Sequence, residues 1–246
     1  MPPTAQPLRA TLEVHPDAHV AALATAQGFA RRAREAVEAR GRFSVALSGG
    51  TAPREAYALL AEEPFRSSIP WDGVHLFWGD ERCVPPGHER SNFRMAHRAF
   101  IGRVPIPPEN VHRMPGELPA ARGAEAYADE LAAFFGEGVP RFDLVHLGVG
   151  PDAHTASLFP FDDSLRERDR VVVPVRHLPD GEWRLSLTVP VLNAAARVEF
   201  LALGASKAGV VHAVVRGPLD PFRLPAQLVR PGDGELVWML DAAAAG

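Results

Sequence analysis

The sequence predicts an α/β fold in which a doubly wound, mainly parallel sheet is flanked by helices. Short apolar segments rich in Val, Leu and Phe alternate along the chain with helical patterns. Several of these segments are apolar almost throughout, which is typical of strands buried on both faces. The 246 residues, 46% of them hydrophobic, are enough for one large core. Since no repeat or low-complexity linker divides them, we expect a single domain over residues 1–246.

Seven segments are predicted as strands because they are short, apolar and bounded by Gly, Pro or Asp. They are residues 43–49, 74–80, 142–148, 171–175, 184–189, 199–204 and 235–240. Helical patterns between them predict helices at residues 17–40, 53–62, 91–101, 120–135 and 206–216. The first helix has Pro16 where a helix can begin and Gly41 just past its end.

Composition excludes several classes of protein. With 26 basic and 30 acidic residues the net charge is −4, and no basic patch suggests a nucleic-acid partner. The single cysteine, Cys83, excludes a disulfide within the chain and fits a reducing compartment. No segment has the apolar length of a membrane span, and the N-terminal stretch lacks a signal-peptide core. We therefore expect a cytoplasmic protein without membrane contact, as a monomer or weak homodimer.

Glycine and polar or charged residues follow four of the predicted strands. In parallel sheets, ligands bind beyond the carboxyl ends of the strands. The sequence therefore predicts that these four segments meet at one binding site. They are SGGTAP (48–53), GDER (79–82), GVGPDAH (148–154) and GASK (204–207).

The first segment joins a strand to a helix through a glycine turn. Free N–H groups at a helix start attract anions, and Gly49 and Gly50 let the main chain approach one closely. Ser48 and Thr51 add hydroxyl donors. An anion site and an ordinary strand–helix turn are both compatible with these residues.

The second segment places charges directly after a strand. Arg82 is able to clamp a phosphate or carboxylate with two hydrogen bonds, and Asp80 to orient a histidine. A solvated surface loop is the alternative for these charges. Ser91 and Asn92 further on have the residue types of a helix N-cap.

The third segment matches the G-x-G-x-x-[GA] pattern of dinucleotide-binding turns, which alone is weakly specific. Two features count against a dinucleotide: Pro160 shortens the following crossover, and Arg176 ends the next strand where a ribose-binding acid is expected. The alternative is that the turn presents His154, at the predicted start of a helix, for proton transfer. A capping or surface histidine is the simpler interpretation of a lone His.

The fourth segment contains Lys207, the only lysine of the chain. A cation near a helix start is unfavourable toward the helix dipole, so its presence suggests an anion nearby. We expect no metal, because no His or Cys residues are paired at ligand spacing.

Together these segments resemble the glucosamine-6-phosphate isomerase/6-phosphogluconolactonase family, on its lactonase side, from about residue 12 onward. GDERCVP followed by SN (79–92) and FDLVHLGVGPDAHTASLFP (142–160) are the most specific matches. LSGG with a nearby Pro (47–53), RLSLTVPVLNAA (184–195), GASKA (204–208) and VWMLD (237–241) match as well.

The resemblance implies the Rossmann-like sugar-phosphate isomerase/lactonase fold and hydrolysis of 6-phospho-D-glucono-1,5-lactone to 6-phospho-D-gluconate, without a cofactor. It implies that His154 is the general base, and we expect Asp80 to orient His154 or its water. The residues expected to bind the substrate and its phosphate are Ser48, Gly49, Gly50, Thr51, Arg82, Ser91, Asn92, Arg184 and Lys207.

Two positions depart from the family pattern. Ala153 replaces a usual glycine, which matters if that position needs a positive φ, and Ala52 stands where a hydroxyl residue is usual. Two other functions remain open. One is a deaminase or isomerase of an amino-sugar phosphate. The other is a non-catalytic sugar-phosphate sensor. A sensor is expected to need a DNA-binding or partner domain, and the residues before the first helix are too few to form one.

Overall fold

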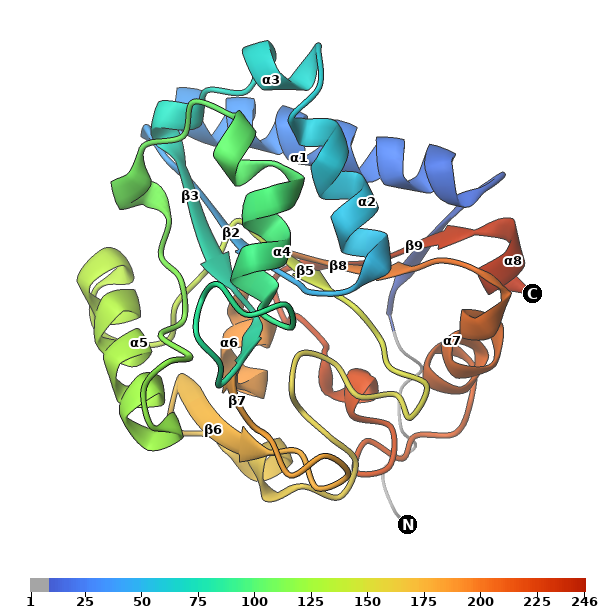
Figure 1. Ribbon diagram of the computed structural model, residues 1–246. Helices are drawn as coiled ribbons and strands as arrows, with labels where there is room; N and C mark the ends of the chain where they lie inside the picture. The colour runs from blue at the N-terminus through green and yellow to red at the C-terminus, as the bar shows by residue number, and fades with distance from the viewer. Residues whose placement is uncertain (1–8) are drawn as a thin grey trace.

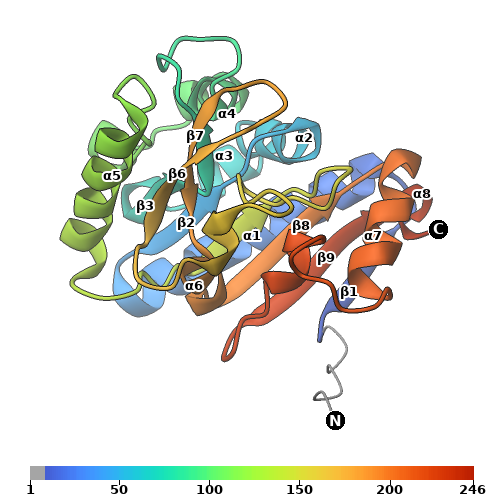
Figure 2. The ribbon, with the colours of Figure 1, turned by 90° about the horizontal axis from the view of Figure 1, so that it is seen from below.

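A six-stranded sheet, parallel throughout, runs through the centre of the molecule in this computed structural model (Figures 1 and 2). The structure describes residues 9–246. Most of the N-terminal stretch, which was predicted to lack a signal-peptide core, lies outside these residues. In spatial order the strands are β1 (Thr11–His15), β9 (Glu235–Asp241), β8 (Arg197–Ala202), β5 (Leu144–Leu147), β2 (Phe43–Leu47) and β3 (Val74–Trp78).

Helices cover both faces of this sheet, as a doubly wound fold requires. In Figure 1, α1 to α4 lie above the edge-on sheet and α6 and α7 lie below it. The helices are α1 (Ala18–Arg40), α2 (Thr51–Leu60), α3 (Phe65–Ser68), α4 (Asn92–Ala99), α5 (Ala120–Phe135), α6 (Val189–Ala194), α7 (Ala208–Val215) and α8 (Ala242–Ala245). The predicted α/β fold is confirmed, and each of the five predicted helices is present.

Helix α1 shows how sequence signals set helix boundaries. Asp17 is the N-cap, and its carboxylate accepts a hydrogen bond from the N–H of Val20 at 2.9 Å. Gly41 follows the helix with a φ of 75°, and its N–H closes the last turn onto the carbonyl of Val37.

A second, three-stranded sheet was not expected. It has the order β4 (Asp80–Arg82), β7 (Trp183–Leu187), β6 (Val172–Arg176), and both pairings are antiparallel. The segments predicted at 171–175 and 184–189 are therefore strands, but they form this sheet rather than the parallel one. Helix α5 packs against it. The pairing of β4 with β7 matters for the site, because it places Arg82 opposite Arg184 in the strand register although the two are far apart in the sequence.

Two local predictions were incomplete or wrong. Strand β1 at residues 11–15 was not predicted, although it pairs along its whole length with β9. The helix expected to begin at His154 does not form: residues 154–160 make turns, and Thr155 pairs with Leu158 in an isolated bridge. Among residues 9–246, no helix is long and apolar enough to cross a membrane.

Candidate active site

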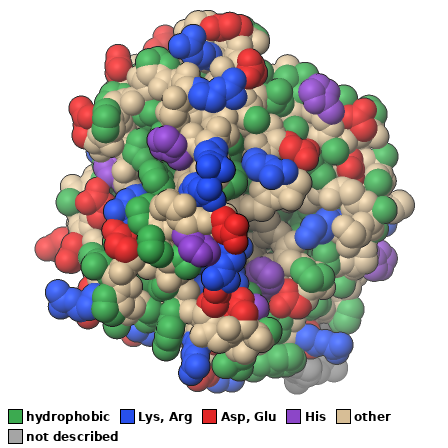
Figure 3. Space-filling view, viewed as in Figure 1, with side chains coloured by type: hydrophobic (Ala, Val, Ile, Leu, Met, Phe, Trp, Pro, Cys, Tyr) green, Lys and Arg blue, Asp and Glu red, His purple; other side chains and the backbone are tan. Residues whose placement is uncertain are grey.

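A cavity of about 460 Å³ opens at the carboxyl ends of the parallel strands. It receives residues from all four glycine-containing segments, so the expectation that they meet is confirmed. Figure 3 shows basic and histidine side chains gathered around a hollow on this face of the molecule. Of the predicted site residues, the cavity is lined by Ser48, Gly49, Gly50, Thr51, Asp80, Arg82, Asn92, His154, Arg184 and Lys207. Ser91 lines an adjoining cavity of about 390 Å³ instead.

The glycine turn between β2 and α2 forms one wall. Gly50 has a φ of 104° and is the N-cap of α2, so the first N–H groups of that helix face the cavity without helical partners. A Cβ on Gly49 would lie 2.1 Å from Oδ1 of Asn92. Only glycine therefore lets the Asn92 side chain reach across the turn. This wall has the form of an anion site.

Strand β4 contributes the second wall. Nη1 of Arg82 donates to Oδ1 of Asn92 at 2.5 Å, and Nδ2 of Asn92 donates to Oδ1 of Asp80 at 3.1 Å. Oδ2 of Asp80 accepts from Oγ of Ser157 at 2.7 Å. The buried Asp80 thus holds Asn92 and the 154–160 segment in place.

Asp80 does not contact His154, contrary to the orienting bond expected from the sequence. The reason lies in the strand order, because β2 separates β3, which leads to Asp80, from β5, which leads to His154. Both side chains line the cavity. The action of Asp80 on the attacking water stays a prediction.

The partner of His154 is Asp152. Nδ1 of the imidazole lies 2.5 Å from Oδ1 of the carboxylate, which also accepts from the N–H of His154 at 3.2 Å. Partial burial raises the pKa of Asp152, but the charge of His154 and its hydrogen bonds lower it more, so that it ends below its ordinary value. Gly150 makes room for this pair, since a Cβ there would lie 2.2 Å from the ring of His154.

Two further cations point at the cavity. Nζ of Lys207 donates to the carbonyl of Val149 at 2.8 Å, and Nη2 of Arg184 donates to Oδ2 of Asp180 at 3.1 Å. Nε of Arg184 is buried without a hydrogen-bond partner in residues 9–246. Within the same residues, neither Lys207 nor Arg82 is within ion-pair distance of a carboxylate. The uncompensated positive charges of Lys207 and Arg82 suit an anionic ligand.

Glu81 was part of the GDER motif, but no role was predicted for it. It is 2% exposed, and its carboxylate accepts hydrogen bonds from the N–H groups of Arg82, Asn92 and Phe93 and from Oγ of Ser91. Ser91 in turn accepts from the N–H of Arg94, so it is the predicted N-cap of α4. Because negative charge at a helix N-terminus is stabilising, the sequence Asp-Glu-Arg before a capping Ser could have indicated this role.

Position 153 requires the conformation that glycine adopts freely. Ala153 has a φ of 65° and is completely buried. The family's usual glycine therefore has a physical reason at this position, and this chain accepts the strain of an alanine there. Among residues 9–246, no group of three or more His, Cys, Asp or Glu side chains is arranged to hold a metal ion.

Comparison with known proteins places the chain in a family. The model of the glucosamine-6-phosphate isomerases/6-phosphogluconolactonases matches residues 16–238. The chain belongs to this family. A 6-phosphogluconolactonase from a Nostoc species is 39% identical over 242 residues, which cover 96% of this chain and 98% of that protein. The human 6-phosphogluconolactonase is 42% identical over 213 residues, covering 84% and 81% of the two chains.

Solved structures of the family agree with the fold described above. The 6-phosphogluconolactonase from Trypanosoma brucei superposes with a TM-score of 0.85 at 28% identity, covering 97% of this chain and 98% of that one. A monomeric glucosamine-6-phosphate deaminase superposes with a TM-score of 0.78 at 17% identity, and this likeness shows the fold alone.

Proposed function

We propose that this chain hydrolyses 6-phospho-D-glucono-1,5-lactone to 6-phospho-D-gluconate, a carboxylic-ester hydrolysis of the oxidative pentose phosphate pathway. Relatives at 39% and 42% identity carry the name 6-phosphogluconolactonase. The observation that carries the proposal is structural. His154, which is hydrogen-bonded to Asp152, lines the same cavity as Arg82 and Lys207, whose charges no carboxylate of the described residues neutralises.

The pair is suited to general base catalysis. A carboxylate only accepts hydrogen bonds, so the bond to Asp152 fixes the proton of a neutral His154 on Nδ1 and leaves Nε2 free to accept one. In the proposed reaction Nε2 takes a proton from water while the water oxygen attacks the lactone carbonyl. The resulting imidazolium is stabilised by Asp152. It returns its proton to the ring oxygen as the ester C–O bond breaks, and the product is the open-chain acid.

The cations act at the other end of the substrate. Arg82, Lys207 and the N-terminus of α2 are assigned to the phosphate, with Arg184 as a further donor. Binding a phosphate remote from the reacting carbonyl fixes the carbonyl against the base, so part of the binding energy becomes rate acceleration. Redox chemistry has no part in this reaction, because ester hydrolysis transfers no electrons to a carrier.

A coupled assay tests the proposal. Glucose-6-phosphate dehydrogenase generates the lactone, and its disappearance is followed with and without the protein. We expect disappearance much faster than spontaneous hydrolysis. An unchanged rate would contradict the proposal, and release of ammonia from glucosamine 6-phosphate would favour the deaminase instead. The cytoplasmic location and the monomeric or weakly dimeric state stay predictions.

A further inference from the structure

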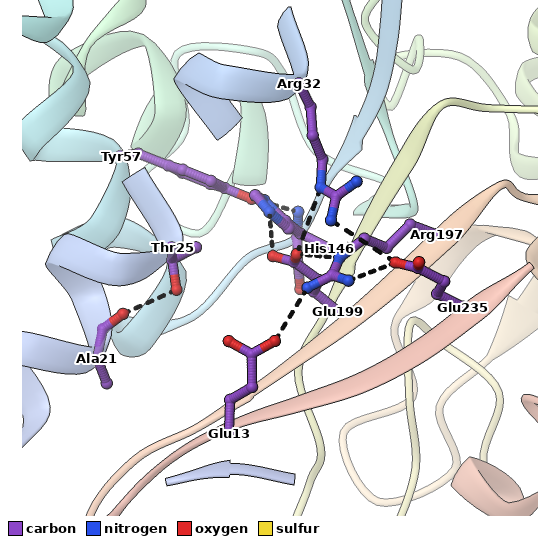
Figure 4. Close-up of polar contacts among 10 residues, drawn as sticks. Glu13, Ala21, Thr25, Arg32, Tyr57, His146, Arg197, Glu199 and Glu235 are labelled. Carbon is purple, nitrogen blue, oxygen red and sulfur yellow. Dashed lines mark hydrogen bonds and ion pairs between the residues drawn. The ribbon is translucent and has the colours of Figure 1, made fainter. Parts of the chain in front are cut away.

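A chain of buried polar side chains lies beneath the glycine turn of the site, and the proposed mechanism does not use it. Figure 4 shows Tyr57, His146 and Glu199 in line, reaching from α2 through β5 to β8. Their exposed fractions are 1%, 0% and 2%. Burying ionisable groups to this extent is costly unless each has a partner, so the arrangement needs a physical reason.

This series of polar side chains begins at the candidate site itself. The N–H of Ser48 donates to the hydroxyl oxygen of Tyr57 at 3.0 Å. Ser48 lines the cavity and directly precedes Gly49 and Gly50, so this bond fixes the point at which the main chain leaves β2 and enters the anion-binding turn. An unpaired N–H at that buried point would cost free energy.

The Tyr57–His146 bond has a defined direction when His146 carries a single proton, on Nε2. Because a backbone N–H only donates, the Tyr57 oxygen accepts from Ser48 and its own proton is available to Nδ1 of His146, 3.2 Å away. The rings of Tyr57 and His146 also stack, with centroids 5.7 Å apart. His146 then carries its proton on Nε2, which lies 3.4 Å from Oε2 of Glu199. This distance is long for a hydrogen bond, and both atoms are buried without a hydrogen-bond partner in residues 9–246, so each is the other's nearest ion-pair contact.

Glu199 is held as an anion at the far end. Burial raises the pKa of Glu199, but the interactions with His146 and Arg197 outweigh burial and lower the pKa to about 2. Nε of Arg197 donates to Oε1 of Glu199 at 2.5 Å, and the same guanidinium pairs with Glu235 at 2.5 Å and with Glu13 at 3.4 Å. An ionised Glu199 keeps the proton of a neutral His146 on Nε2, and therefore keeps Nδ1 as an acceptor.

The same pair also lies next to the third glycine-containing segment, residues 148–154. His146 lies on β5, two residues before Gly148, and Val149 of that segment accepts the hydrogen bond of Lys207. Tyr57 and His146 therefore link the starts of two segments. Residues 48–53 supply the anion-binding turn, and residues 148–154 supply the carbonyl that Lys207 contacts.

We infer that Tyr57, oriented by His146 and Glu199, is a positioning residue that sets the phosphate-binding turn at Ser48–Thr51. The inference rests on the proposed function, because it takes the bound anion to be the substrate phosphate. Tyr57 does not touch substrate; it acts through the Ser48 N–H. Its loss should weaken the binding of phosphorylated ligands and leave the chemistry at His154 nearly unchanged.

Tyr57→Phe tests this role against a matched control. Tyr127 is equally buried, and its hydroxyl accepts the N–H of Trp78 at the end of β3 and donates to the carbonyl of the same residue at 3.4 Å, where Tyr57 instead has a histidine. Losing one such bond is worth about 0.5–1.5 kcal/mol, or roughly two- to tenfold in binding. We expect Tyr57→Phe to raise KM and the calorimetric Kd of 6-phosphogluconate by this factor, with kcat nearly unchanged. Tyr127→Phe should lower thermal stability by a similar amount and leave Kd unchanged.

A second pair of variants tests the relay through His146. Asn at position 146 keeps a side-chain oxygen that can accept from Tyr57, whereas Leu keeps none. We expect His146→Leu to raise Kd as Tyr57→Phe does, and His146→Asn to restore most of the affinity. An unchanged Kd in Tyr57→Phe, or an equal rise in Tyr127→Phe, would overturn the inference, and equal effects of Asn and Leu would remove His146 from it. Kd is measured without turnover, so a wild type that fails to hydrolyse the lactone contradicts the proposed function separately.

Discussion

Nδ1 of His154 lies 2.5 Å from Oδ1 of Asp152, a residue only two positions earlier in the chain. The turn that presents both is closed by a hydrogen bond of 2.9 Å from the N–H of Gly150 to the carbonyl of His154. The proposed base and its carboxylate partner therefore come from one short loop. Their mutual geometry does not depend on packing between distant strands, and variants within the loop test the mechanism directly.

His154→Ala should abolish most of the lactonase activity. General base catalysis contributes about 10²–10⁴-fold, so we expect kcat to fall by that factor. Asp152→Asn removes a charge-assisted bond worth about 1.5–3 kcal/mol, and kcat should fall roughly 10- to 100-fold. Steady-state kinetics with the coupled assay measure both. A kcat for His154→Ala equal to that of the wild type would rule out the base.

Asp152 should also make stability depend on pH. Although burial raises the pKa of Asp152, its interactions with His154 lower it below the ordinary value. A depressed folded-state pKa gives stability that is present above the unfolded pKa of about 3.9 and lost as pH falls through the folded pKa. Asp152→Asn lacks this contribution at every pH.

Urea unfolding from neutral into acid pH measures this dependence. The difference in free energy of unfolding between wild type and Asp152→Asn should be largest near neutrality and shrink toward acid pH. Because the carboxylate is partly exposed, we expect a small difference. A difference that grows as the pH falls would have the wrong sign for this account.

The sequence predicted the site better than it predicted the contacts within it. The rule that parallel strands end at one edge brought Ser48, Arg82, His154 and Lys207 to one cavity. The rule could not place Asp80 relative to His154, because their separation depends on the order of the strands. The order β5-β2-β3 cannot be read from the sequence. Asp80 therefore bonds Ser157 rather than His154.

The second sheet was missed for a related physical reason. Three residues, Asp80 to Arg82, are too few to show a strand period, and they become a strand only by pairing with β7 far along the chain. The family resemblance had suggested Arg184 as a phosphate ligand. The pairing of Arg82 with Arg184 is how the fold brings that side chain to the cavity.

Gly150→Ala should damage catalysis by displacing the imidazole. The added Cβ would lie 2.2 Å from Nδ1 and Cε1 of His154 and 2.7 Å from Oδ1 of Asp152, so the pair must move. A misplacement of about 1 Å is able to cost roughly 100-fold in rate, and we expect a fall of that order in kcat/KM. Gly148→Ala is the matched control, because its nearest neighbour, Oγ of Ser48, lies at an ordinary 3.8 Å. Similar losses in both variants would show that the damage is not specific to the imidazole.

Glu81→Gln should destabilise the protein more than an isosteric change usually does. Burial raises the pKa of Glu81, while hydrogen bonds from Phe93, Asn92, Arg82 and Ser91 oppose the rise. An amide NH₂ in place of either oxygen would face two of these donors and leave them unpaired. At about 1–3 kcal/mol for each unpaired group, we expect a loss of about 2–6 kcal/mol in the free energy of unfolding.

Chemical denaturation measures this loss, with Glu38→Gln as the control. Glu38 is exposed on α1, and the same substitution there should change stability by less than about 0.5 kcal/mol. Equal stabilities of the two variants would mean that the carboxylate does not hold the start of α4 as described.

Ala153→Gly should cost little or nothing, although it removes a completely buried methyl group. The lost methyl costs about 0.8 kcal/mol and the freer unfolded chain about 0.4–1 kcal/mol. Against this, glycine relieves a left-handed strain of about 1–2 kcal/mol at a φ of 65°. Ala195→Gly is the control, since Ala195 is equally buried outside helices and strands but has a φ of −59°. Denaturation should find Ala153→Gly the more stable by about 1 kcal/mol; the reverse order would mean that the 150–154 turn is unstrained.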